Sequence, residues 1–426
     1  MNSEFERAYL ELAAWCRARG YAGHDPFDGL NSRLFQATPL KHSPFARLVL
    51  TQAVKRSPVN LRPLLGVAAG KNPKGTALFA LAALARIRTM RAARARGDEE
   101  TMGSEELATN DETASLEKTE REALVHLDEL LSMRVEGGSG AAWGYNFDWQ
   151  SRTFFAPRGT PTLVPTAFAA RAFIEASEVF GEQKFQDTAR GVCEWILREL
   201  PRTVEREDEV CFSYIPAEKT RIFNASLLAG ETLASVGALT GESELCELAI
   251  GAARYVVRRQ RTDGAWTYGA EWYQSWIDNF HTAFVLLSLS RIMEACGAEA
   301  RAEFAPALSR GYEFWRASFF LADGWPKYYH DNPYPADIHS AAASIVALVE
   351  LRQIDDGATA QAERIARWTL RHLRDPRGFF YYQRRRFHTV RTPYMRWAQS
   401  WMLYALARLL ETQGEKVKGE KGERER

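Results

Sequence analysis

The feature that most constrains this chain is a recurring glycine- or aromatic-rich cluster that precedes alternate predicted helices. The clusters are Trp143-Gly144-Tyr145, Phe212-Ser213-Tyr214, Gly264 to Tyr268, Gly324 to Tyr328 and Gly378 to Tyr381. Polar residues suited to a helix N-cap follow them at Thr162, Asn224, Asp278, Asp337 and Thr392, spaced by 62, 54, 59 and 55 residues. Each interval holds an aromatic loop and two helices of about 16 residues, the pattern of a helical-hairpin repeat.

Helical periodicity dominates the rest of the chain. Ala- and Leu-rich segments with apolar residues at i, i+3, i+4 and i+7 cover 75–95, 166–180, 187–200, 225–239, 245–260, 280–295, 304–319, 338–352, 361–373 and 394–410. Long strands are not evident, although residues 379–382 could form a small hairpin. The pattern predicts an all-α (α/α)6 toroid, in which alternate helices form an inner ring.

Six hairpins is the natural total, and the segments 45–55, 75–95 and 116–133 are expected to supply those missing from the repeat. We therefore expect residues 1–412 to form a single toroid domain. Within it, the polar segment 97–118 is predicted to be a flexible insertion, and 413–426 a disordered charged tail. An open α-solenoid is the structural alternative, which the long aromatic loops disfavour because solenoid turns are short.

Charge and cysteine usage exclude several classes of protein. With 55 basic and 54 acidic residues, the net charge of +1 argues against a nucleic-acid-binding protein. The five cysteines contain no CxxC pair, so neither zinc nor a disulfide framework is expected. Residues 1–19 read as an amphipathic helix rather than a signal peptide, and the longest apolar run, 77–85, is too short to cross a membrane. We expect a cytoplasmic protein without metal or cofactor, since no nucleotide-binding or metalloprotease motif is present.

In such a ring the inner helices run in one direction, so their N-termini and the aromatic clusters meet at one face. Aromatic faces beside polar groups suit sugar rings, and the basic residues of these loops favour an anionic sugar such as a uronate. The sequence therefore predicts an oligo- or polysaccharide site. Its predicted binding residues are Trp143, Tyr145, Trp149, Trp266, Tyr268, Trp276, Trp325, Lys327, Tyr329, Tyr382, Arg396 and Trp397.

Two successive helix starts carry an aspartate followed by a histidine: Asp278 with His281, and Asp337 with His339. Either pair could exchange a proton with a substrate, although a helix cap or shared ancestry of the repeats explains them equally well. Asp148, between two aromatic residues, is a candidate general acid or simply part of a capped turn.

Tyr328 could act as acid or base if the neighbouring Lys327 lowers its pKa, or could simply pack in its loop. Arg396 could clamp a carboxylate or form a structural salt bridge. The polar stretch 24–32 is expected to brace the first hairpin.

These candidates fit two kinds of carbohydrate chemistry. Hydrolysis needs two carboxylates in the cleft, drawn from Asp148, Asp278 and Asp337. An epimerase or lyase would use Tyr328, Tyr329, His281 or His339, with Arg396 or Lys327 neutralising a uronate. The alternatives are a non-catalytic glycan-binding or assembly module and a terpene cyclase or prenyltransferase, which would need an apolar cavity at the ring centre.

Two resemblances bear on the fold. Ala252, Tyr255, Val256, Gln260, Gly264 and Trp266 match the spacing of the Gln-Trp repeat of squalene-cyclase and prenyltransferase toroids, but the acidic catalytic box of the cyclases and the zinc ligands of the prenyltransferases are absent. This resemblance supports the toroid and not terpene chemistry.

The second resemblance spans residues 20–410. The segments 28–32, 72–75, 143–149, 160–162, 278–282, 326–329, 337–339 and 393–397 resemble a bacterial extracellular-polysaccharide biosynthesis protein family. That family is similar in architecture to six-hairpin glycosidases and to the helical domain of glucuronyl C5-epimerases. The resemblance implies a role in polysaccharide biosynthesis and assigns no catalytic residue.

Overall fold

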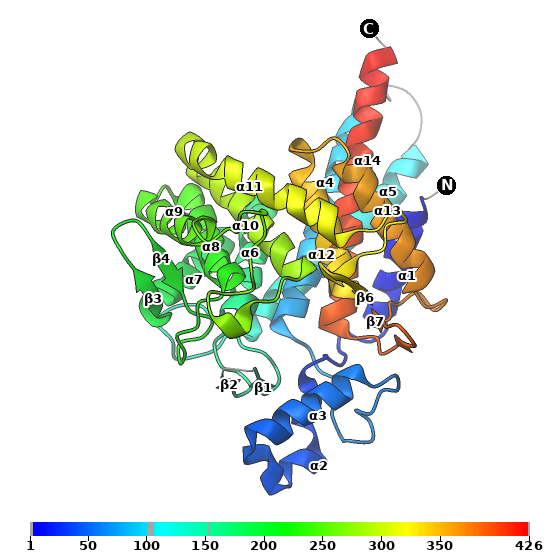
Figure 1. The fold of residues 1–426 in the computed structure, drawn as a ribbon. Helices are drawn as coiled ribbons and strands as arrows, with labels where there is room; N and C mark the ends of the chain where they lie inside the picture. The colour runs from blue at the N-terminus through cyan, green and yellow to red at the C-terminus, as the bar shows by residue number, and fades with distance from the viewer. Residues whose placement is uncertain (1–2, 101–105, 152–153, 425–426) are drawn as a thin grey trace.

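The structure is a computed structural model that describes the backbone of residues 3–100, 106–151 and 154–424, and the side chains of 3–95, 113–151 and 154–412. Helices dominate it, and strands are confined to short hairpins at one end of the helices (Figure 1).

Six inner helices form a closed ring. Each packs against the next, and the last packs against the first. They are α4 (Pro73–Glu100), α6 (Leu163–Phe180), α8 (Phe223–Thr240), α10 (Asn279–Cys296), α12 (Ile338–Glu350) and α14 (Trp401–Arg424), the last preceded by a π-helical turn, Met395–Ser400. The outer helices are α5 (Glu106–Ser132), α7 (Gln183–Glu199), α9 (Ser243–Val257), α11 (Ala298–Phe319), α13 (Ala358–His372) and α1 (Glu4–Arg17). The predicted (α/α)6 toroid is confirmed.

The sequence pattern distinguishes the two rings. The inner helix α8 is buried on nearly all sides, including the small residues Ala225, Ala229 and Gly230, because it packs between two inner neighbours and an outer partner. Outer helices such as α7 and α13 bury one apolar stripe and expose a charged face. Amphipathicity thus separates a helix that faces solvent from one enclosed by protein.

The sixth hairpin differs from the prediction. The two ends of the chain form it, since α1 packs against α14, while α4 and α5 form another hairpin. The predicted helix at 45–55 is α3 (Pro44–Arg56), which with α2 (Arg33–Gln36) lies below the ring in Figure 1, on the side of β1 and β2. Only Thr51 and Val54 of α3 are fully buried, so this helix lacks the apolar surface that an inner helix needs.

The strands lie before the inner helices. They are β1 (Trp149–Gln150) with β2 (Phe155–Ala156), β3 (Arg202–Glu205) with β4 (Val210–Phe212), and a four-stranded antiparallel sheet of β5 (Lys327–Tyr329), β6 (Asn332–Asp337), β7 (Gln383–Arg384) and β8 (Thr389–Val390) in sequence order. The strand β6 ends at Asp337, directly before α12, so this sheet fixes the start of that helix.

Three of the five predicted N-caps are observed, at Thr162, Asp278 and Asp337. Asn224 instead lies inside the first turn of α8, whose N-cap is Ile222. Thr392 precedes the π-helical turn, which begins after Tyr394.

Helical structure also extends further than predicted in the two polar segments. Within 97–118, α4 continues to Glu100 and α5 starts at Glu106, while residues 101–105 lie outside the described part of the chain. Likewise, α14 continues through the predicted tail to Arg424. The tail is rich in Glu, Lys and Arg and the segment 97–118 is rich in Glu. These residues have high helix propensity, so polarity alone did not predict the backbone conformation.

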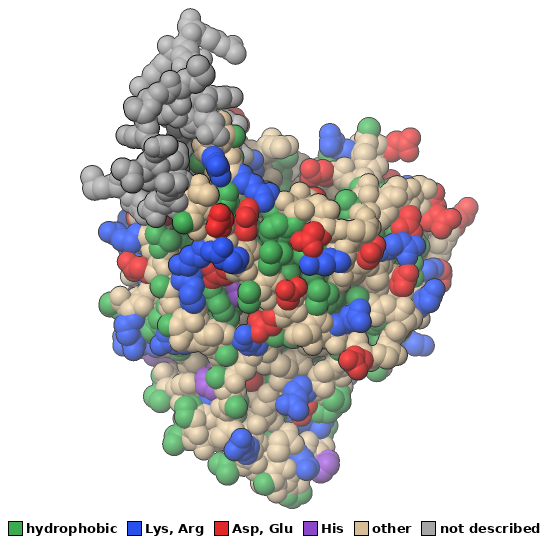
Figure 2. Space-filling model, turned by 180° about the vertical axis from the view of Figure 1, so that it is seen from behind, with side chains coloured by type: hydrophobic (Ala, Val, Ile, Leu, Met, Phe, Trp, Pro, Cys, Tyr) green, Lys and Arg blue, Asp and Glu red, His purple; other side chains and the backbone are tan. Residues whose placement is uncertain are grey.

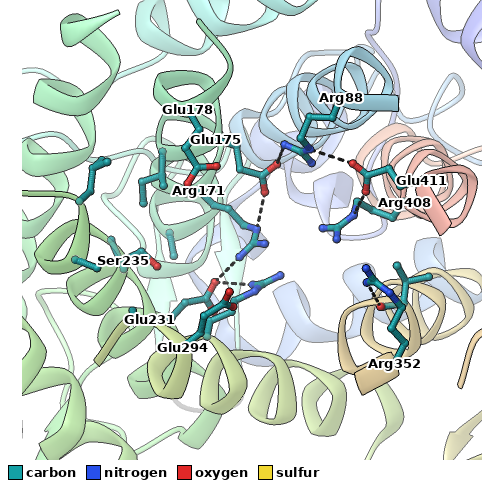
Figure 3. Close-up of a pocket in the computed structure, with 18 of the residues that line it drawn as sticks. Arg88, Arg171, Glu175, Glu178, Glu231, Ser235, Glu294, Arg352, Arg408 and Glu411 are labelled. Atoms are coloured by element: carbon teal, nitrogen blue, oxygen red, sulfur yellow. Dashed lines mark hydrogen bonds and ion pairs between the residues drawn. The ribbon is translucent and has the colours of Figure 1, made fainter. Parts of the chain in front are cut away.

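A network of ion pairs joins the inner helices, beyond their first turns, and Figure 3 shows several of its members around one pocket. It surrounds a cavity of about 770 Å³. Its members are Arg88, Arg171, Glu175, Glu231, Arg291, Glu350, Arg408 and Glu411, with contacts such as Arg171 Nη1 to Glu231 Oε1 at 3.0 Å and Arg291 Nη2 to Glu350 Oε2 at 2.8 Å. Since every inner helix contributes at least one member, the network ties the ring together across its centre.

The outer surface mixes the two signs of charge. On the face shown in Figure 2, acidic and basic side chains are interspersed over the ring. No helix in the described ranges is both long and apolar enough to cross a membrane.

Candidate functional site

An aromatic cleft opens at the N-terminal ends of the inner helices, with a volume of about 440 Å³. Ten of the residues predicted for the site line it: Tyr145, Trp149, Tyr268, Trp276, His281, Tyr328, Tyr329, His339, Arg396 and Trp397. Leu48 and Gln52 of α3, together with Phe27, add a wall from the N-terminal segment. The repeat therefore brings these aromatic loops to one face, as expected for parallel inner helices.

Asp278 serves both as the N-cap of α10 and as the partner of His281. Its Oδ1 accepts the backbone N–H of His281 at 3.1 Å, and its Oδ2 accepts from His281 Nδ1 at 2.7 Å and from Trp276 Nε1 at 3.0 Å. A carboxylate only accepts hydrogen bonds, so it holds the hydrogen of the neutral imidazole on Nδ1 and leaves Nε2 as the basic atom. Asp278 itself is 2 % exposed, whereas His281 lines the cleft.

The second aspartate–histidine pair is built differently. Asp337 caps α12 by accepting the backbone N–H of His339 at 2.9 Å, and it also accepts from Trp397 Nε1 at 3.0 Å and Gln383 Nε2 at 2.9 Å. Burial raises the pKa of Asp337 to about 6. The carboxyl group therefore holds the cleft residue Trp397, and it has no hydrogen bond to the ring of His339.

The His339 ring lies in the cleft among aromatic neighbours. It stacks on Phe280 at a centroid distance of 4.6 Å and lies 4.2 Å from Trp397 and 4.8 Å from Trp401. Neither ring nitrogen has a hydrogen-bond partner among the described residues, although His339 is 1 % exposed. Burial, and then the nearby Lys74 and Arg396, hold the pKa of His339 well below its usual range, so the imidazole is neutral at pH 7.

One phenylalanine joins the two histidines, because Phe280 contacts both imidazoles at centroid distances of 4.0 Å to His281 and 4.6 Å to His339. The cleft thus presents two imidazole groups with available ring nitrogens. Imidazole groups can serve as general acids, general bases or hydrogen-bond donors in catalysis.

The three predicted catalytic carboxylates do not line the cleft. Asp278 and Asp337 lie behind His281 and Trp397. Asp148 accepts the backbone N–H of Arg158 at 2.8 Å and the amide of Gln36 at 3.4 Å, so it holds two loops together. Within the described part of the chain no aspartate or glutamate lines this cleft, and the pair expected for hydrolysis is not brought together there.

Tyr328 lines the cleft, but its neighbour does not activate it. Lys327 Nζ instead donates to the backbone carbonyl of His330 at 2.5 Å. Burial, and then the charges of Asp278 and Asp337, raise the pKa of Tyr328 well above its usual range. Contrary to the prediction, Tyr328 is protonated at neutral pH and can donate a hydrogen bond but cannot act as a base.

Five predicted binding residues lie away from the cleft: Trp143, Trp266, Trp325, Lys327 and Tyr382. Trp143 and Trp266 are buried under outer helices, where their indole N–H groups donate to the carbonyls of Leu130 and Val256. Trp325 packs against Trp368 and Tyr334 beside the four-stranded sheet. These aromatic residues share the loops of the cleft residues, but they point back into the hydrophobic packing.

The match to the Gln-Trp repeat has a structural basis. Gln260 Nε2 donates to the carbonyls of Gly264 and Ala307, both at 2.9 Å, and so ties the loop to α11. Gly311 lies directly against the indole of Trp266, where a Cβ atom would come within 2.3 Å of the ring. This motif fastens a loop to its outer helix and does not contribute to the cleft.

Arg396 lines the cleft but is already paired. Its Nε and Nη2 donate to the two carboxylate oxygens of Asp25 at 2.5 and 2.8 Å, so the predicted carboxylate clamp holds a group of the protein itself. The polar stretch around Asp25 therefore braces the last inner helix, not the first hairpin. The backbone N–H of Met395 donates to the carbonyl of His24 in the same way.

Sequence reasoning missed Lys74, which lines the cleft from the first turn of α4. Its position at the start of the first inner helix, after Asn72 and Pro73, corresponds to the helix starts that carry the two histidines. That correspondence was the available signal, but the aromatic cluster that marks the other repeats is absent before α4.

Comparisons with known proteins support the fold. No family model matches the chain, and no curated protein matches it. Among solved structures, a cellobiose 2-epimerase from Bacillus thermoamylovorans B4167 has a TM-score of 0.58 at 12% identity, over 82% of this chain and 90% of that one. The GH76 α-mannanase BT2949 from Bacteroides thetaiotaomicron has a TM-score of 0.56 at 10% identity, over 82% and 88%. A D-mannose isomerase has a TM-score of 0.51 at 13% identity, over 78% and 87%. At these identities the likeness concerns the fold.

Proposed function

We propose that this protein is a carbohydrate-active enzyme of the epimerase or isomerase type, which exchanges a proton on a sugar carbon next to a carbonyl group. His281 and His339 are the proposed acid and base. The observation that carries the proposal is the Asp278–His281 pair, which faces the same cleft as the unpartnered His339.

The roles follow from the two environments. His281 Nε2 takes the proton from carbon, because Asp278 keeps the hydrogen of the neutral ring on Nδ1 and stabilises the positive charge that the ring then gains. A neutral His339 holds one N–H hydrogen, with which it can donate a hydrogen bond to the oxygen on which negative charge develops. The protonated His281 then returns its proton to carbon, which restores both neutral rings. Tyr328, protonated at neutral pH, can donate a further hydrogen bond.

A carbohydrate is the proposed substrate because aromatic rings and a few polar groups line the cleft. Tyr268 and Trp276 stack at 4.4 Å and 17°, and the Tyr268 ring lies 4.6 Å from the ring of His281. Several solved structures of similar fold are described as sugar epimerases or isomerases, which is consistent with this chemistry.

The two-carboxylate hydrolysis suggested by the sequence finds less support, because the described acidic residues do not line the cleft. A role in polysaccharide biosynthesis is a further proposal, which rests on the resemblance to that bacterial family. The free cysteines Cys16, Cys193, Cys211, Cys246 and Cys296 support our proposal of a reducing, cytoplasmic location.

Solvent exchange tests the reaction. The protein is incubated in D2O with reducing sugars and uronates, and the carbon-bound hydrogens are followed by proton NMR. We expect one C–H signal next to a carbonyl or carboxyl group to disappear with enzyme, and to persist with His281→Gln. Release of a free sugar from a glycoside without such exchange would favour a hydrolase, and binding without either reaction would favour a glycan-binding module.

A further inference from the structure

The floor of the aromatic cleft holds a buried amine without a hydrogen-bond or ion-pair partner among the described residues. Lys74 is 2 % exposed, and its Nζ lies 4.2 Å from the ring centroid of Phe168, 5.3 Å from Phe284 and 5.2 Å from Trp401. In the described part of the chain, no acceptor or carboxylate lies within hydrogen-bond or salt-bridge distance of Nζ. Three aromatic faces stabilise a cation only partly, so this amine lacks the partner that a buried charge requires.

His339 adjoins this lysine. It packs on two of the same rings, Trp401 and Phe284, and both of its ring nitrogens lack partners although it is almost fully buried. Two neighbouring polar side chains, each more than nine-tenths buried, therefore present unused donors or acceptors to one cavity. A structural role alone would leave several polar atoms unsatisfied in a region where burial makes this costly.

The electrostatics of the cleft favour an anion. Burial, and then the charge of Arg396, hold the pKa of Lys74 well below its usual range, so the charged form of this amine needs a nearby anion to stabilise it. Lys55 lies outside the lining of the cleft, with its Nζ 4.3 Å from the ring of the lining residue Phe27. Three carboxyl groups lie behind the cleft wall. Asp25 is bonded twice to Arg396. Asp278 and Asp337 are bonded to the cleft residues His281 and Trp397, and none of the three lies within ion-pair distance of Lys74 Nζ. A neutral sugar hydroxyl could accept a hydrogen bond from Lys74 but could not balance its charge.

We infer that Lys74 binds an anionic group of the substrate at the cleft floor, and that the substrate is an acidic sugar. The anion is the carboxylate of a uronic acid or the phosphate of a sugar phosphate, since an ammonium group accepts either. This inference rests on the proposed function, because it takes the occupant of the cleft to be a carbohydrate.

Binding measurements on the full chain test the inference. The probes for isothermal titration calorimetry at pH 7 are D-glucuronate, D-galacturonate and glucose 6-phosphate, with glucose and galactose as their neutral counterparts. We expect at least one acidic sugar to bind at least tenfold more tightly than its neutral counterpart. The carboxylate and phosphate arms show which anion the site takes.

The matched variants are Lys74→Met and Lys71→Met. Lys71 lies three residues away, outside the lining of the cleft, and forms an ion pair with Glu129. We expect the tenfold preference to fall below twofold in Lys74→Met and to persist in Lys71→Met. Methionine suits the aromatic surroundings of Lys74, and a thermal melt checks that the variant folds.

Equal binding of acidic and neutral sugars to the unmodified protein would overturn the inference, as would binding of none of them or a preference that survives Lys74→Met. The first comparison needs no variant, so it holds even if Lys74→Met fails to fold. Failure of the proposed reaction is distinguishable: binding that depends on Lys74 without C–H exchange would overturn the reaction only. Exchange on neutral sugars that bind as tightly as acidic ones would overturn this inference only.

Discussion

Replacing Asp278 by asparagine separates the orientation of His281 from the folding of α10. The carboxylate accepts three hydrogen bonds, at 2.7, 3.0 and 3.1 Å, whereas an asparagine side chain has one accepting oxygen. Asparagine is as good an N-cap as aspartate, so this oxygen can keep the bond to the backbone of His281. The amide NH2 then faces Nδ1, which favours the tautomer that carries hydrogen on Nε2.

The expected effects on stability and activity differ in size. Loss of hydrogen bonds to a charged group costs about 1.5–3 kcal/mol of unfolding free energy, which leaves the protein folded at 25 °C. The imidazole in the wrong tautomer can no longer take a proton from carbon, and the comparable substitution in a serine protease triad lowers kcat by about 10⁴. We therefore expect the exchange rate of Asp278→Asn to fall by a factor of roughly 10²–10⁴.

The assay is the rate of deuterium incorporation at saturating sugar, paired with a thermal melt. Asp337→Asn is the matched comparison, because it changes the cap of α12 in the same way without a contact to a histidine ring nitrogen. We expect it to lose similar stability and much less activity. Equal losses of activity in the two variants, or a loss in Asp278→Asn that only tracks its unfolded fraction, would refute this reasoning.

Three further predictions concern other parts of the ring. His339→Gln should lower the exchange rate at least about 100-fold, far more than its unfolded fraction explains, because the ring makes aromatic contacts but no hydrogen bond; unchanged exchange in the folded variant would exclude it as acid or base. Glu350→Gln should cost about 3–5 kcal/mol in a denaturant titration at pH 7, because it breaks a buried ion-pair network. Burial raises the pKa of Glu350, but the guanidinium groups of Arg291, Arg171 and Arg408 outweigh it and lower this pKa to about 2. The contribution of Glu350 to folding stability is therefore present above its unfolded pKa near 4.5 and is lost as the pH falls toward 2. Equal loss of stability at low pH in Glu350→Gln would contradict this assignment. Gly311→Ala should destabilise the fold by about 1–3 kcal/mol because its Cβ would meet the Trp266 ring, yet leave sugar affinity unchanged; weakened affinity in the folded variant would place Trp266 in the site after all.

The ring could be predicted from the sequence because the signal is local and repeats. Helical periodicity and aromatic clusters recur at nearly constant spacing, and each hairpin forms from contiguous chain. The sixth outer helix could not be assigned in this way, since α1 meets α14 only when the ring closes. A contact between the two ends of a chain leaves no trace in local periodicity.

In the candidate site too, contacts between residues close in sequence could be predicted, and contacts between distant segments could not. The bond between Asp278 and His281 follows from helix-cap geometry three residues apart, so the sequence could indicate it. The second pair is only two residues apart, which places the ring of His339 away from the Asp337 carboxyl group. Lys74 gains its environment from three rings on three other helices, and Arg396 finds Asp25 at the far end of the chain, so neither could be predicted locally.

The sequence did not distinguish the aromatic residues that line the cleft from those that pack in the core. Trp266 and Trp276 belong to the same loop, yet the first packs on Gly311 and the second donates to Asp278 at the cleft. Trp266 can turn toward the outer helix because Gly311 leaves room for its ring. That pairing lies 45 positions along the chain, well beyond a helical period.

A crystal structure with a bound sugar tests the central claim most directly. The proposal predicts a sugar ring in the aromatic cleft, with a C–H carbon about 3–3.5 Å from His281 Nε2 and an adjacent carbonyl or carboxyl oxygen within hydrogen-bond reach of His339. A sugar bound outside this cleft, or one inside it whose reacting carbon meets neither histidine, would contradict the account.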